Sequence, residues 1–137
     1  MTREELDWKQ YDMMALTIRW GIELLLKANV FYYAVTGAIL SFYLSRPAPQ
    51  PSTLKFALVV PALLALVLAV IFLLSASTMW KAETQIQTIA GNLKLTAWPD
   101  TVGLKWALIG SAVLLLLVAL ALVLVMAFES CLGIRRS

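Results

Sequence analysis

Histidine is absent from this 137-residue chain, and cysteine occurs once. Imidazole is the commonest haem and metal ligand and the usual group that titrates near neutral pH. Its absence excludes a bis-histidine haem site, a histidine-ligated chlorin and a histidine proton relay. Cys131 has no partner for a disulfide within the chain, so cysteine use indicates no compartment. We interpret Cys131 as a thiol beyond the last apolar run, with acylation at this position as the alternative.

Charged residues are also scarce, at 14% of the chain against 61% hydrophobic residues. The net charge of +3 comes from 11 Lys and Arg against 8 Asp and Glu, without the clustered basic patch that nucleic acid requires. No charged residue lies at the centre of any long apolar run, where ion and proton paths of transporters have theirs. The sequence therefore predicts neither a nucleic-acid partner nor a proton-coupled transporter.

Catalytic motifs are missing as well. The chain has no GxGxxG, no phosphate-binding loop, no HExxH and no paired-cysteine motif. Glu5, Asp7 and Asp12 are best interpreted as surface charges of one helix. The sequence predicts that the protein is not an enzyme, and it indicates no catalytic, cofactor-binding or metal-binding residue and no cofactor.

The N-terminus does not resemble a secretory signal. The charges in residues 2–20 differ from the basic, then apolar, pattern of such a signal.

Three long apolar runs are what the sequence does contain. They predict an all-α integral membrane protein with three transmembrane helices, an N-terminal amphipathic helix and an amphipathic interfacial helix between the second and third spans. Counting from Trp20 to Tyr43 gives about 34 Å of helix, enough to cross a bilayer between interfacial aromatics. The predicted segments are the amphipathic helix 1–23, the first span 24–45, a proline-rich connector 46–55, the second span 56–77, the interfacial helix and turn 78–103, the third span 104–128 and a polar tail 129–137.

The clearest helical pattern lies between the second and third spans. Apolar residues recur there at spacings of 3, 4, 3 and 4, which places them on one stripe of a helix. We call this stripe the seam; it consists of Met79, Ala82, Ile86, Ile89 and Leu93. The intervening residues are polar, so the seam predicts an amphipathic helix held at the membrane surface. Pro99 is expected to end it, and Asp100 or Thr101 to cap the next helix.

The N-terminal helix carries charges on one stripe and apolar residues on another. Leu6, Met13 and Trp20 recur every seven residues. Two interpretations stay open: a solvated helix that leads into the membrane, or a helix that docks on the seam or on a partner. The charged stripe consists of Glu5, Lys9, Asp12, Arg19, Glu23 and Lys27.

Small residues form a stripe in each span, and such stripes let helices approach closely. We expect them to serve packing within the chain, with an interface to another subunit as the alternative. The second-span stripe is expected to face the first span, and Pro61 is expected to kink that span. The stripes are Ala34, Gly37, Ala38 and Ser41 in the first span, Ala62, Ala65, Ala69 and Ala76 in the second, and Gly103, Ala107 and Ser111 in the third.

The distribution of positive charge predicts the orientation. Seven Lys and Arg lie on the side of the N-terminus and the 78–103 segment, and four lie on the other side. The positive-inside rule then places the N-terminus in the cytoplasm and the C-terminus on the opposite side of a cell membrane, which we take to be a bacterial inner membrane. All five tryptophans, at positions 8, 20, 80, 98 and 106, lie on the N-terminal side.

These features support two functional hypotheses from different classes. The first is a non-enzymatic membrane subunit that packs laterally in a larger complex, for example an energy-transducing or photosynthetic one, in a structural, accessory or assembly role. A pigment- or quinone-associated accessory subunit is a special case of it. The second is a homo-oligomeric pore or membrane-permeabilising protein, similar in size and span number to some phage holins or to a defence effector. The expected partners are the lipid bilayer and other membrane subunits, or further copies of the chain, through the small-residue faces.

Overall fold

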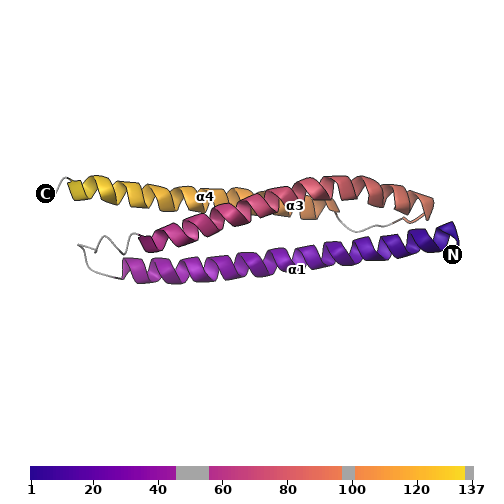
Figure 1. The fold of residues 1–137 in the computed structure, drawn as a ribbon, viewed down its shortest axis with the longest axis horizontal. Helices are drawn as coiled ribbons and strands as arrows, with labels where there is room; N and C mark the ends of the chain where they lie inside the picture. Colours follow the sequence, from indigo (N-terminus) through magenta and orange to yellow (C-terminus); the bar gives the residue numbers. More distant parts are fainter. Residues whose placement is uncertain (46–55, 97–100, 135–137) are drawn as a thin grey trace.

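The computed structural model describes residues 1–45, 56–96 and 101–134, and all regular structure in these ranges is helical. The elements are α1 (Arg3–Leu44), the short 3₁₀ helix η1 (Phe56–Leu58), α3 (Val59–Asn92) and α4 (Thr101–Ile134). Helices α1, α3 and α4 are each long and apolar enough to cross a membrane. Figure 1 shows them as an elongated bundle in which α1 begins at one end and α4 finishes at the other. The predicted all-α architecture is confirmed at this level.

Helix α1 joins the predicted N-terminal helix and first span without a break. Its start is a capping box: the Thr2 hydroxyl accepts from the Glu5 amide at 3.4 Å, and the Glu5 carboxylate accepts from the Thr2 amide at 3.0 Å. These two bonds satisfy orphan donors of the first turn. No proline interrupts the sequence before position 47, so the change from polar to apolar composition leaves the helix intact.

Helix α3 likewise joins the predicted second span to the seam. Pro61 is its third residue, preceded by η1. In the first turn the missing amide of proline costs no intrahelical hydrogen bond. Pro61 therefore fits the first turn of α3, and the kink expected near this end of the span stays a prediction.

The C-terminus of α3 is set by backbone geometry. Lys94 adopts a left-handed conformation, with φ of 53°. The Leu95 amide donates to the Ala90 carbonyl at 3.0 Å and the Lys94 amide to the Gly91 carbonyl at 3.2 Å, which is the Schellman arrangement. The helix thus ends before Pro99, which was expected to end it. Residues 97–100, including the predicted cap Asp100, lie outside the described residues, and Thr101 is already helical.

The bundle core is formed mainly between α3 and α4, which contact each other more extensively than either contacts α1. The α3 alanine stripe is buried, with Ala65 and Ala69 fully inaccessible. The stripe lies in apolar clusters with residues of both α1 and α4, so the expected packing on the first span is confirmed in part and α4 is a further partner. The buried face of α4 is a stripe at spacings of 4, 4, 3, 4 and 3. It consists of Leu104, Leu108, Ala112, Leu115, Ala119 and Leu122.

Two helices extend beyond the beginning of α4. Because Lys105 in the first turns of α4 lies beside Glu83, residues 3–19 of α1 and 80–92 of α3 continue as a pair past the three-helix part (Figure 1). We call this pair the two-helix extension. The seam continues the second span in one unbroken helix, α3.

At the opposite end, α4 continues through the first part of the predicted polar tail to Ile134. The proline-rich connector at 46–55 and the arginines at 135 and 136 lie outside the described residues. Helix α1 also contacts η1, so the first and second spans are adjacent and antiparallel, as the short connector predicts.

Candidate functional site

The exposed face of α1 is the first candidate surface. Ala34, Gly37, Ala38 and Ser41 are all exposed, and we call them the small-residue face. A Cβ added at Gly37 would have no atom of another element within 4 Å. Helix α1 instead packs through Tyr32, Thr36 and Tyr43, which are at most 4% exposed. The expectation that this small-residue stripe serves packing within the chain is therefore wrong.

Two polar side chains of α1 contact the other two helices. The Tyr32 hydroxyl donates to the Pro61 carbonyl of α3 at 3.3 Å. Asn29 donates to the Leu25 carbonyl at 3.0 Å and to the Ser111 hydroxyl of α4 at 3.4 Å. Sequence reasoning missed Asn29 because it examined charged residues in the spans, whereas this contact is made by a neutral amide.

The α4 stripe of small residues is divided between two environments. Gly103 and Ala107 are exposed, and Ser111 is partly buried against Asn29. Only the last of the three therefore contributes to packing within the chain. Ala107 remains on the outer surface of α4, as Gly37 does on α1.

An ion pair fastens the beginning of α4 to α3. The Lys105 ammonium lies 3.1 Å from a Glu83 carboxylate oxygen, with the two side chains 13% and 16% exposed. The same ammonium lies 4.5 Å from the centre of the Trp80 ring, a cation–π contact. Glu83 was expected on the polar side of the seam helix. The two residues are 22 positions apart in the sequence, so no helical spacing rule could predict this pair.

A second polar contact closes the other end of the bundle. The buried Tyr43 hydroxyl of α1 donates to the Glu129 carboxylate of α4. Lys105 and Glu129 are 24 residues apart, or about 36 Å along α4. Helix α4 is thus tied to α3 at one end and to α1 at the other, with an uncharged stretch between.

The two-helix extension is the second candidate surface. Ile86 of the seam is 1% exposed and belongs to the same apolar cluster as Ile18, Tyr11 and Met14 of α1. Tyr11, Met14 and Ile18 therefore form the docking face of α1. The heptad stripe at Leu6, Met13 and Trp20 is exposed instead, at 47%, 69% and 72%. Both stripes have helical spacing, so only tertiary packing could choose between them.

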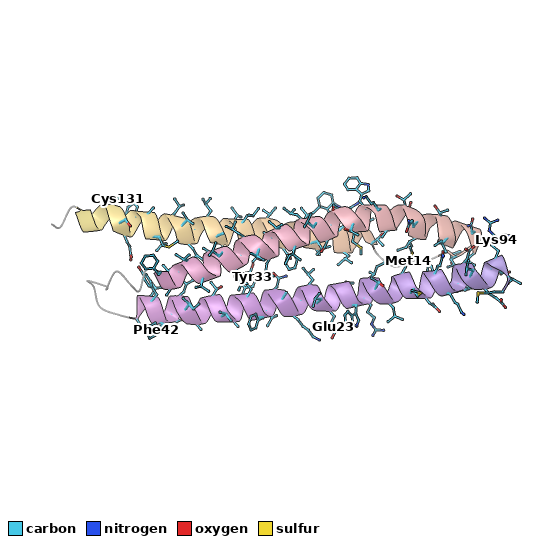
Figure 2. The ribbon with its side chains drawn as sticks, in the orientation of Figure 1. Met14, Glu23, Tyr33, Phe42, Lys94 and Cys131 are labelled. Atoms are coloured by element: carbon cyan, nitrogen blue, oxygen red, sulfur yellow. The ribbon has the colours of Figure 1, made fainter. Side chains whose placement is uncertain are left out.

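The seam positions are the inner side of the extension. Met79, Ala82, Ile89 and Leu93 are each partly buried. Of the two interpretations of the N-terminal helix, the structure therefore has the one in which this helix docks on the seam. In Figure 2, Met14 lies on the α1 side near the extension, and Lys94 lies at the end of α3 beside the N-terminus.

The described residues contain no group of three or more His, Cys, Asp or Glu side chains arranged to hold a metal ion. Cys131 is exposed on α4 (Figure 2). Comparisons of the chain with protein-family models, with curated proteins and with solved structures find no match. The exposed surfaces described above are therefore the features from which a function is inferred.

Proposed function

We propose that the chain is a non-enzymatic integral membrane subunit that crosses the bilayer three times and packs laterally in a larger membrane protein complex, in a structural, accessory or assembly role. The observation that carries the proposal is the small-residue face of α1. It is a surface suited to close helix–helix approach, and no residue in the described ranges covers it.

Three tryptophans support the placement in the membrane. Trp20, Trp80 and Trp106 come from three different helices and are 72%, 65% and 63% exposed. Trp80 lies under the Lys105 ammonium, Trp106 follows Lys105 in the chain, and Gly21, next to Trp20, lines one cavity with Met79 and Leu104, so the three lie at a similar level of the bundle. Tryptophan prefers the membrane–water interface. From this level to Tyr43 or Glu129 the helices run about 33–36 Å, which matches a bilayer core with its interfaces.

This placement puts the two-helix extension in water on the N-terminal side. With the N-terminus in the cytoplasm of a bacterium, the extension projects from the inner membrane as an antiparallel helix pair. Residues 3–19 of α1 alone give it a length of about 26 Å. The seam then joins the α3 helix of the extension to the α1 helix, and the outer surfaces of both helices are presented to cytoplasmic or membrane partners.

The proposal is tested by purification in a mild detergent. Gly37→Leu and Ala107→Leu add bulk to two exposed faces and leave the spans apolar, so the chain should insert normally but recover several-fold less of its co-purifying membrane subunits. Ala127→Leu is the matched control, because Ala127 is also an exposed alanine of α4 but lies on a different face of that helix. Purification of the wild-type chain as a single homogeneous homo-oligomer would contradict the subunit proposal.

The alternative is a homo-oligomeric pore or membrane-permeabilising protein. The same small-residue face favours it, since a second copy could pack there as well as a foreign helix. The described parts of the three spans carry no charge near their centres, so only a ring of copies could line a hydrated path. Dye release from liposomes that rises steeply with protein concentration and is lost in Gly37→Leu would favour the pore. We expect no release.

A further inference from the structure

The gap between α1 and α3 at the level of the exposed tryptophans holds a cavity of about 270 Å³. Its lining comes from all three long helices, with Leu104 and Leu108 of α4 at its inner side. Leu24 and Ile71, which are 64% and 48% exposed, flank its outer side. The cavity is therefore reached laterally, from the surface that faces lipid in the proposed membrane placement.

Glycine creates part of this space. A Cβ built at Gly21 would meet nothing within 4 Å, although Gly21 lines the cavity between two helices. If a water-sized group takes up about 30 Å³, the cavity accommodates about nine such groups. A methylene is of similar size, so the space corresponds to roughly half of an ordinary acyl chain.

The lining chemistry excludes a strongly polar ligand. No charged residue lines the cavity among the described residues. Its three hydroxyls all donate within their own helices: Thr17 to the Met13 carbonyl at 2.8 Å, Ser75 to the Ile71 carbonyl at 2.8 Å and Thr78 to the Leu74 carbonyl at 3.0 Å. Because these three hydroxyl donors are already hydrogen-bonded, an apolar ligand in the cavity would leave none of them without a partner.

Lys81 of α3 carries a positive charge beside the cavity, on the side of the two-helix extension. Lys81 follows Thr78 by three residues, which places it about one turn farther along α3, at the start of the two-helix extension. It is exposed, and no ion pair is found for it within the described ranges. A lysine at the membrane interface extends its ammonium to the headgroup level. Its position suits the phosphate of a lipid whose chain enters the cavity.

We propose that this cavity binds one acyl chain of an anionic phospholipid, with the lipid phosphate at Lys81. The proposal rests on the membrane placement given above. The bound chain fills the gap between α1 and α3 at Gly21 and supports the point where the two-helix extension leaves the membrane.

The test uses the full-length chain in phosphatidylcholine vesicles that contain phosphatidylglycerol with a photoreactive acyl chain. Mass spectrometry of the crosslinked peptides should place most of the adducts in residues 17–24 and 71–79. Gly21→Leu fills the cavity and should reduce these adducts several-fold. Leucine also favours helix over glycine, so the variant is expected to fold. Gly37→Leu, on another face of the same helix, is the matched control and should leave the adducts unchanged.

The headgroup part is tested with Lys81→Gln. It should reduce adducts from the phosphatidylglycerol probe more than those from a phosphatidylcholine probe, because the choline group neutralises the net charge of that headgroup. Arg19→Gln is the control, because Arg19 lies on a different face of α1 at a similar level. Adducts spread evenly over all exposed apolar residues, or unchanged adducts in Gly21→Leu, would overturn the lipid site while leaving the membrane placement intact. Failure of the chain to associate with vesicles would overturn both.

Discussion

Lys105 and Glu83 form a partly buried ion pair that joins the first turns of α4 to the middle of α3, with the Lys105 ammonium also above the Trp80 ring. The pair marks the level at which the three-helix part becomes the two-helix extension. A half-buried charge that loses its partner is penalised, because it cannot recover full hydration.

Glu83→Ala should therefore lower the free energy of unfolding in detergent by about 1–3 kcal/mol. A double-mutant cycle with Lys105→Ala isolates the pair energy. The control cycle uses Glu23 and Lys27, an i,i+4 pair at 2.7 Å whose side chains are 59% and 71% exposed. Solvent screening should make the coupling in that pair barely measurable. Equal coupling energies in the two cycles would show that burial does not strengthen the Glu83–Lys105 pair.

Ile86→Asp should separate the two helices of the extension. Ile86 is 1% exposed, so the substitution removes about 1.5–3 kcal/mol of apolar burial and adds the cost of a desolvated carboxylate. Gln87→Asp, at the neighbouring exposed position, should be nearly silent. Limited proteolysis of residues 3–19, together with thermal unfolding, measures the difference. Similar behaviour of both variants would mean that the seam is not buried in solution.

Thr36→Val should maintain or raise stability. The Thr36 hydroxyl is buried and has no hydrogen-bond partner in the described part of the chain, so its replacement by a methyl of similar shape removes a desolvation cost of about 1 kcal/mol. Thr17→Val is the comparison, since the exposed Thr17 hydroxyl already donates to the Met13 carbonyl and its loss should change little. A marked fall in melting temperature for Thr36→Val alone would indicate that this hydroxyl has a partner in the membrane.

The orientation is tested by thiol labelling with a membrane-impermeant reagent. Cys131 is exposed near the end of α4, and an odd number of spans places it on the side opposite the N-terminus. In a Cys131→Ser background, Thr2→Cys and Lys81→Cys should label from the cytoplasmic side, whereas the native Cys131 labels from the other side. Labelling of Thr2→Cys and Cys131 from one side would contradict three spans.

Several features of this protein could be predicted from its sequence. The charge-poor apolar runs indicate helices of membrane-spanning length, since few other structures satisfy so much backbone among apolar side chains. The 3-4-3-4 spacing at Met79 to Leu93 identifies the side of that helix that becomes buried. The absence of histidine and of paired cysteines limits the chemistry of the chain whatever its fold.

Tertiary structure alone decided which of several equivalent faces are used. In an almost uniformly apolar helix such as α4, every stripe satisfies the requirement for burial, so periodicity could not select Leu104, Ala112 and Ala119 as the inner side. On α1, two stripes have helical spacing, and the one through Ile18 packs while that through Trp20 stays outside. The pairing of Lys105 with Glu83 and the uncovered face at Gly37 have the same origin. They depend on the relative rotation of packed helices, which results from side-chain fit between distant segments and leaves no periodic signal in either one.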